Sequence, residues 1–294
     1  MEEMHTIQWF PGHMTRTRRQ IQSNLKLVDL VAEIVDARIP YSSRNPDLKN
    51  IIQQKPRLVL MNKCDMADPN QTARWLKIYK EAGIMAVPLD CKTGKGLNRF
   101  VPAVQEVLAD KIRSWQAKGM KGKTIKVMVV GIPNVGKSSF INRMVKQNRA
   151  KVEDRPGVTR GNQWFSVGKG MELLDTPGVL WPKFDDRIVG ERLAFIGSVK
   201  DEVVDTETLS GRLLEFLSQN YPNLLIQRYK LTAEDLQQEG YKILERIGKN
   251  RGMLISGGEI DTARAALTVL DEFRGAVLGK ITLDKAEDYS HVRI

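Results

Sequence analysis

The chain of 294 residues is poor in cysteine and has no long apolar run. Two cysteines, Cys64 and Cys91, are too few for a disulfide framework, argue against a metal site, and fit a reducing compartment. The longest apolar run, near residues 127–132, is far shorter than the ~20 residues that span a bilayer. No apolar block follows Glu2 and Glu3, which argues against a secretory signal or a transit peptide. We therefore expect a cytoplasmic protein without a membrane partner.

Acidic residues are also in deficit. The chain has 46 Lys and Arg against 35 Asp and Glu, which gives a formal net charge of +11. Such a charge favours a polyanionic partner, because each phosphate that pairs with a Lys or Arg releases condensed counterions. A basic surface that is only solvated is the alternative, and charge alone does not distinguish RNA, DNA and an acidic membrane.

Short apolar runs alternate with amphipathic stretches over much of the chain. Runs of strand length cover residues 29–36, 57–61, 84–89, 125–130, 163–167 and 172–174. Helical patterns lie between several of them, at residues 72–82, 97–115 and 137–145. Strands that alternate with helices predict an α/β fold with a doubly wound, mostly parallel sheet.

The two ends of the chain show helical patterns only. Residues 14–27 are basic and amphipathic, and helical segments cover residues 206–218, 232–247 and 261–278. With no convincing strand after about residue 206, we predict a small all-helical domain at the C-terminus. The predicted organisation is a basic N-terminal segment at 1–27, an α/β domain at 28–180, a linker at 181–205 and the helical domain at 206–294.

Residues 131–138 read Gly-Ile-Pro-Asn-Val-Gly-Lys-Ser, which is the spacing of a phosphate loop between a strand and a helix. Its glycines let backbone N–H groups close around a phosphate, and the helix N-terminus adds positive potential. We expect Lys137 to bridge the β- and γ-phosphates and the Ser138 hydroxyl to ligate Mg²⁺. The predicted nucleotide contacts in this segment are Asn134, Val135, Gly136, Lys137, Ser138 and Ser139.

A second phosphate-side motif, Asp-Thr-Pro-Gly, occupies residues 175–178 after a short predicted strand. Asp175 is expected to hold Mg²⁺ through water, and the Gly178 N–H to sense the γ-phosphate. Thr159 is the candidate that completes the Mg²⁺ shell; an ordinary loop threonine is the alternative.

Residues 62–65, Asn-Lys-Cys-Asp, directly follow a strand, where a base-reading loop belongs. The Asp65 carboxylate can accept from N1–H and the 2-amino group of guanine. Adenine lacks that donor pair, so Asp65 favours GTP and disfavours an ATP-using kinase or ATPase. Lys63 can lie along the base plane, and Asn62 can brace the phosphate loop.

Residues 90–92, Asp-Cys-Lys, depart from the usual Ser-Ala-Lys of the next base-side motif. The backbone N–H of Cys91 can still meet guanine O6. We therefore keep Asp90, Cys91 and Lys92 as candidate nucleotide contacts.

The order of these motifs is unusual. In an ordinary GTPase the phosphate loop leads and the base-reading motif follows, whereas here residues 62–65 precede residues 131–138. The sequence therefore predicts a circularly permuted phosphate-loop GTPase domain, with the basic connection at 117–123 joining the former ends. Because residues 175–178 then close the domain, loss of the γ-phosphate is expected to act on the linker and the helical domain.

Three further segments are Gln-Trp-Phe-Pro-Gly-His-Met at 8–14, Asp-Ala-Arg-Ile-Pro at 36–40 and Ser-Ser-Arg-Asn-Pro at 42–46. Through these segments, together with the helical C-terminus, the chain resembles the bacterial ribosome biogenesis GTPase A family over nearly its whole length. The resemblance implies a monomeric GTPase that converts GTP to GDP while it assists late maturation of the large ribosomal subunit. It also implies contact with ribosomal RNA, rather than DNA, and release on hydrolysis. A non-ribosomal regulatory GTPase that acts on a protein or membrane partner remains the alternative.

Catalysis is the least ordinary feature of the sequence. Many GTPases carry a water-orienting glutamine where this chain has Val179, so slow hydrolysis alone and stimulation by the ribosomal subunit are expected. The catalytic candidates are Lys137, Thr159 and His13, and the role of His13 is implied by the resemblance. The alternative is that the segment with His13 contacts RNA or only packs against the protein. In GTPases that this phosphate loop resembles, an asparagine at the position of Asn134 helps to bind K⁺. A simple structural asparagine is the alternative.

Basic residues in the predicted helical domain are candidates for an RNA-backbone footprint if they share one face. They are Lys242, Arg246, Lys249, Arg251, Arg264 and Arg274. A solvated basic face is the alternative. Because aromatic residues are sparse there, we expect folded ribosomal RNA to be read by shape and phosphate rather than by stacking.

Overall fold

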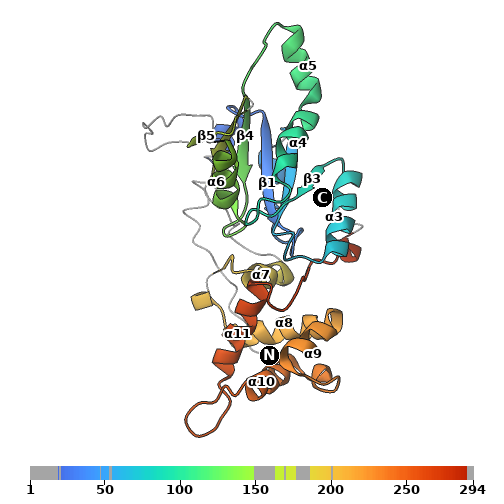
Figure 1. Cartoon of the computed structure of the whole chain (residues 1–294), viewed down its shortest axis with the longest axis vertical. Coiled ribbons are helices and arrows are strands. Elements are labelled where there is room, and N and C mark those ends of the chain that lie inside the picture. The colour runs from blue at the N-terminus through green and yellow to red at the C-terminus, as the bar shows by residue number, and fades with distance from the viewer. Residues whose placement is uncertain are drawn as a thin grey trace. The chain divides into compact units, whose positions relative to one another are not determined.

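The computed structural model describes residue 19 and residues 21–46, 48–52, 55–148, 163–168, 170–176, 186–199 and 201–289. These residues form two compact units. Those up to residue 176, together with 284–289, make a sheet unit, and those from 186 to 283 make a helical unit (Figure 1). Within the described ranges, no helix is long and apolar enough to cross a membrane.

The sheet unit is built on a sheet of six described strands. They are β1 (Leu30–Asp36), β2 (Arg57–Asn62), β3 (Met85–Pro88), β4 (Ile125–Val130), β5 (Trp164–Ser166) and β6 (Met171–Asp175). Their order is β3-β2-β1-β4-β6-β5, and β5 is the antiparallel member among them. All seven residues of β1 are buried, as expected for a central parallel strand that is covered on both faces. The predicted doubly wound, mostly parallel sheet is confirmed.

The direction in which the chain winds changes between β1 and β4. From β1 the chain continues through β2 to β3 on one side, and β6 and β5 lie on the other side of β4. Open α/β sheets bind ligands at such a switch point, beyond the carboxyl ends of the strands. Because β1, β2, β3, β4 and β6 are parallel, the segments that follow them all start at this edge. The permuted order of the motifs therefore does not separate them in space.

Helices and aromatic side chains cover the sheet. The described helices of this unit are α2 (Leu48–Ile52), α3 (Pro69–Glu81), η1 (Leu97–Arg99), α4 (Phe100–Val107), α5 (Ala109–Ala117), α6 (Lys137–Asn148) and η5 (Ala286–Tyr289). Trp75 of α3 is buried in a core cluster with β1 and β2 residues. Phe100 of α4 meets Phe140 of α6 edge to face, with ring centroids 5.0 Å apart. The single helix predicted for 97–115 is interrupted at Leu108, whose φ of −100° and ψ of 12° are not helical.

The last described residues return to the sheet unit. Asp284 is fully buried, and its carboxylate accepts hydrogen bonds from the N–H groups of Tyr41 and Ser42, both at 2.7 Å. The indole N–H of Trp75 donates to the Asp284 carbonyl at 2.8 Å, and Tyr289 stacks on Tyr41 with centroids 4.3 Å apart. Residues 284–289 therefore differ from the prediction that placed them in the helical domain. A buried carboxylate needs such donors, and the sheet unit supplies them.

The helical unit contains the remaining described helices. They are α7 (Arg187–Phe195), η3 (Asp201–Val203), α8 (Thr206–Asn220), α9 (Pro222–Tyr229), η4 (Asp235–Gln237), α10 (Gly240–Asn250) and α11 (Thr262–Arg274). Gly211 of α8 and Gly240 of α10 let the two backbones touch, because a Cβ on Gly240 would lie 2.1 Å from the Gly211 carbonyl oxygen. In this part of the described chain, the only strand-like pairing is a bridge between Leu254 and Ile260. The predicted helical C-terminal region is confirmed.

Three boundaries in this unit differ from the sequence prediction. Helix α7 occupies part of the expected linker at 181–205, because Asp186 caps it by accepting from the Ile188 N–H at 2.8 Å. The helix expected at 232–247 begins only at Gly240. Helix α11 ends at Arg274, before the end predicted at residue 278.

Candidate nucleotide-binding site

Two glycines of the phosphate loop stand where a side chain would collide with the scaffold. A Cβ on Gly131 would lie 2.7 Å from the Ile34 carbonyl oxygen, on neighbouring β1. A Cβ on Gly136, whose φ is +103°, would lie 2.3 Å from Nδ2 of Asn62. The loop therefore needs glycine both to turn and to approach the base-side loop closely.

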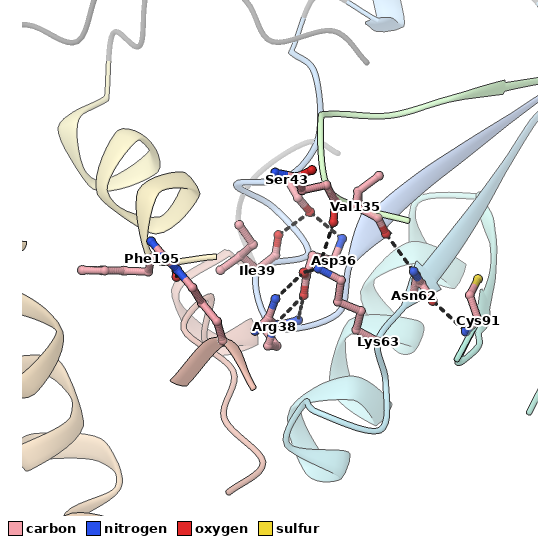
Figure 2. A network of polar contacts seen from close by, with 11 residues as sticks. Asp36, Arg38, Ile39, Ser43, Asn62, Lys63, Cys91, Val135 and Phe195 are labelled. Carbon is pink, nitrogen blue, oxygen red and sulfur yellow. Dashed lines mark hydrogen bonds and ion pairs between the residues drawn. The ribbon is translucent and has the colours of Figure 1, made fainter. Parts of the chain in front are cut away.

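Asn62 joins three loops at this edge of the sheet (Figure 2). Its Nδ2 donates to the Val135 carbonyl at 2.7 Å, and its Oδ1 accepts from the Cys91 N–H at 3.1 Å. The side chain is 3% exposed, so both bonds are shielded from water. The bond to the phosphate loop is the bracing expected from the motif, and the bond to Cys91 adds the loop after β3.

The Cys91 N–H was expected to meet guanine O6, but in this geometry it is engaged by Asn62. The neighbouring Lys92 N–H donates to Asp90 Oδ1 at 2.7 Å. Burial alone would raise the pKa of Asp90, but hydrogen bonds from the Thr93 hydroxyl and from the N–H groups of Lys92 and Thr93 hold that pKa below its usual value. The Asp90 carboxylate therefore stabilises the loop after β3 through these hydrogen bonds. Burial raises the pKa of the Cys91 thiol to about 12, so the thiol stays neutral.

Among the residues that the structure describes, two carboxylates at the site have a buried oxygen atom with no hydrogen-bond partner. They are Oδ1 of Asp65, after β2, and Oδ1 of Asp175, the last residue of β6. Burial raises the pKa of Asp175, and nearby Lys137 offsets part of that increase. An unpaired buried carboxylate oxygen is costly unless a ligand supplies the missing contact. Asp65 therefore fits the two N–H donors of guanine, and Asp175 fits a hydrated Mg²⁺.

Lys137 begins α6 and lies within the phosphate loop. Its ammonium donates to the carbonyls of Gly131 at 3.0 Å and Ile132 at 2.9 Å. Burial lowers the pKa of Lys137 to about 8, and the charge of Asp175 opposes this shift. A phosphate that enters the loop would strengthen the charged form. The neighbouring Ser138 and Ser139 are exposed at the N-terminus of α6, as is Asn134 on the loop.

Lys63 leaves β2 in the left-handed conformation, with φ of +61°. Its ammonium donates to the Asn134 carbonyl at 3.0 Å and lies 3.0 Å from Oδ2 of Asp36. No role was predicted for Asp36 from the sequence. Its position at the end of β1, beside the strand that carries the phosphate loop, is the signal that identifies it.

The remaining predicted site residues cannot be placed. His13, Thr159 and Gly178, with Val179, lie outside the described residues. Their expected roles stay predictions.

A first prediction concerns the contact between Gly136 and Asn62. We expect Gly136→Ala to break the Asn62–Val135 bond and to weaken GDP binding about tenfold or more, because a buried amide then loses its partner. Binding of a fluorescent GDP measures the change. Gly122→Ala is the matched control, since Gly122 also has a positive φ (+74°) but nothing lies within 4 Å of its added Cβ. Equal GDP affinity in the two variants would contradict the assignment.

A second prediction follows from the lowered pKa of Lys137. Phosphate favours the ammonium form, so GDP affinity should be flat below about pH 7 and fall above about pH 8, by up to about tenfold per pH unit. Fluorescent GDP titrations between these limits and about pH 9 measure this. Lys137→Arg should remove the dependence, because a guanidinium keeps its proton. A wild-type affinity that is constant up to about pH 9 would show that Lys137 does not titrate in this range.

A family model described as 50S ribosome-binding GTPase matches residues 126–241. Ribosome biogenesis GTPase A of Bacillus cereus is 47% identical over 283 residues, which cover 96% of this chain and 95% of that protein. The mouse mitochondrial ribosome-associated GTPase 1 is 35% identical over 94% of this chain and 90% of its own length.

The fold also matches a solved structure. The GDP-bound structure of YlqF from T. maritima has a TM-score of 0.69 and 25% identity, and the match covers 92% of this chain and 100% of that one. Relatives of this identity and coverage extend over both the sheet unit and the helical unit. The chain therefore belongs to the ribosome biogenesis GTPase A family.

Proposed function

We propose that this chain hydrolyses GTP to GDP and phosphate, and that the nucleotide cycle controls its docking on a precursor of the large ribosomal subunit. The GTP-bound form docks during late maturation, and hydrolysis drives release. The observation that carries this proposal is the 47% identity with a ribosome biogenesis GTPase A across 96% of the chain. The proposal places the protein in the cytoplasm as a monomer, without a DNA or membrane partner.

The roles of the site residues follow from their positions. Asp65 reads the guanine edge, Lys63 lies along the base, and the loop from Asn134 to Ser139 wraps the phosphates. The unpaired Oδ1 of Asp175 supports its role in holding Mg²⁺, together with the Ser138 hydroxyl and Thr159. When bound, Mg²⁺ neutralises charge on the phosphates.

The proposal also assigns the groups that act in GTP hydrolysis on the ribosomal subunit. Lys137 stabilises charge on the β- and γ-phosphates, and the Gly178 N–H senses the γ-phosphate. Because Val179 cannot orient water, His13 supplies the catalytic imidazole when the protein is bound to the ribosomal subunit. Asn134 would help to hold K⁺, which would add a further positive charge there.

The helical unit offers a narrower RNA surface than the sequence suggested. Lys242, Arg246, Arg251 and Arg274 each pair with a carboxylate of their own unit. Arg274 also donates to the Ala194 and Phe195 carbonyls, so its role is to hold α11 to α7 rather than to meet RNA. Lys249 and Arg264 are exposed, and no ion pair is described for either. We propose these two as the phosphate contacts of the helical unit.

We predict that purified large ribosomal subunits raise GTP turnover about tenfold or more in K⁺ buffer. The stimulation should fall when Na⁺ replaces K⁺. His13→Ala should keep GTP affinity and lose the stimulated turnover, whereas the matched control His5→Ala should behave as wild type. Released phosphate measures the rate.

Co-sedimentation separates the two parts of the proposal. Binding to large subunits should require GTP and fall steeply with salt, and Lys137→Ala should lose it. No stimulation and no co-sedimentation would replace the ribosomal proposal with a regulatory GTPase that acts on a protein or membrane. Stimulation that is equal in Na⁺ and K⁺ would remove the K⁺ role alone.

A further inference from the structure

Asp36 ends β1 at the switch point of the sheet and is fully buried. Its Oδ1 accepts from the backbone N–H of Arg38 at 3.0 Å and from Nε of Arg38 at 2.9 Å. Its Oδ2 accepts from Nη2 of Arg38 at 2.8 Å and lies 3.0 Å from Nζ of Lys63 (Figure 2). Each carboxylate oxygen therefore has two donors.

The charges around Asp36 fix its ionisation. Burial alone would raise the pKa of Asp36, but the positive charges of Arg38 and Lys63 and the bonds from Arg38 hold that pKa far below its usual value. Arg38 is itself 2% exposed and forms an ion pair with Asp36, with Nη2 2.8 Å from Oδ2. The pair is therefore permanently ionised, and it presents a fixed negative oxygen to the ammonium of Lys63.

Lys63 connects Asp36 to the phosphate loop. Its ammonium lies between Oδ2 of Asp36 and the Asn134 carbonyl, at 3.0 Å from each. It thus connects the ends of three neighbouring strands, because Asp36 ends β1, Lys63 follows β2 and Asn134 lies in the loop after β4. The Lys63 ammonium is therefore held on two sides by groups of the protein itself.

A distant segment of the chain supports the loop that holds Asp36. The N–H of Asp36 donates to Oγ of Ser43 at 3.0 Å. In the same loop, the N–H and the hydroxyl of Ser42 donate to the buried carboxylate of Asp284, at 2.7 Å and 2.8 Å. Asp284 thereby anchors the segment between Asp36 and the following helix from a point 242 residues away in sequence.

We propose that Asp36 is a positioning residue for guanine-nucleotide binding, which acts by fixing the Lys63 ammonium against the phosphate loop. Arg38 keeps the carboxylate charged and oriented, and Asp284 keeps its loop in place. The base-side loop and the phosphate loop are then aligned before the nucleotide arrives, so binding loses less conformational entropy. This inference rests on the proposed binding of GTP and GDP, and it goes further by naming what arranges the site.

The same strand contains a carboxylate that serves as the matched control. Glu33 lies three residues before Asp36 on β1, is 1% exposed and pairs with Arg57 of β2. Among the contacts described for Glu33, none reaches a nucleotide-site loop. Glu33→Gln therefore measures what loss of a buried ion pair on β1 does to the fold alone.

The test is a double-mutant cycle on nucleotide affinity with Asp36→Asn, Lys63→Met and both together. Methionine keeps an unbranched apolar side chain along the base but removes the ammonium. We expect each single variant to weaken fluorescent GDP and GTP binding about tenfold, and the double variant to be no weaker than either single one. For Asp36→Asn, turnover at saturating GTP should stay near wild type, so KM rises while kcat does not. Glu33→Gln should lower the melting temperature but change GDP affinity less than about twofold.

Several results would overturn the inference. Losses that add in the double variant would show that Asp36 does not act through Lys63, and an equal loss in Glu33→Gln would reduce the effect to general stability. Wild-type affinity in Lys63→Met would also overturn it, whether or not Asp36→Asn folds. If Asp36→Asn fails to fold, Asp284→Asn takes its place in the cycle. It should lower nucleotide affinity about threefold in the wild-type background and should have no further effect in the Lys63→Met background. A wild-type protein that binds neither nucleotide would instead refute the proposed function.

Discussion

The site depends on the two hydrogen bonds of the Asn62 side chain. They join the phosphate loop at Val135 to the loop after β3 at Cys91, across sequence separations of 73 and 29 residues. A buried amide that loses a partner costs about 1–3 kcal/mol, so the three loops hold one another in a single arrangement. Gly136 is required because any side chain there would occupy the path of the Asn62 amide. The permutation changes the order of these loops along the sequence but keeps the two Asn62 hydrogen bonds.

Three aspartates at the same edge of the sheet differ in how far hydrogen bonds from the protein satisfy their carboxylates. Asp36 has two donors on each oxygen and is satisfied by the protein itself. Asp65 and Asp175 each have a buried oxygen that accepts no hydrogen bond from the described part of the chain. The first arrangement resists change, whereas a base and a hydrated cation are the ligands proposed to satisfy the other two. Residue type alone does not reveal this division, because all three are aspartates at the end of a strand or just after one.

The sequence predicted the parts of the molecule that local patterns encode. The alternation of apolar runs gave the sheet, and the spacing of Gly131, Gly136 and Lys137 placed the phosphate loop between β4 and α6. Contacts between distant residues were beyond its reach: the Cys91 N–H bonds Asn62, and Asp284 returns to a loop 242 residues earlier. Neither contact leaves a periodic signal, because each is a single polar residue whose partner is chosen by the tertiary fold. Helix α7 escaped prediction for a similar reason, since its cap, Asp186, stands in a stretch without a clear apolar period.

We propose that a base-reading loop encoded before the phosphate loop completes one guanine site with it. The most direct measurement is the affinity of Asp65→Asn for GTP and for XTP, whose base carries a carbonyl where guanine has its 2-amino group. An amide can donate to that carbonyl and cannot accept two N–H bonds as the carboxylate does. We predict that the preference moves from GTP to XTP in this variant, with unchanged contacts to the phosphates. Unaltered GTP binding, or an equal loss for both nucleotides, would contradict the assignment of Asp65 to the base and with it the assembled site.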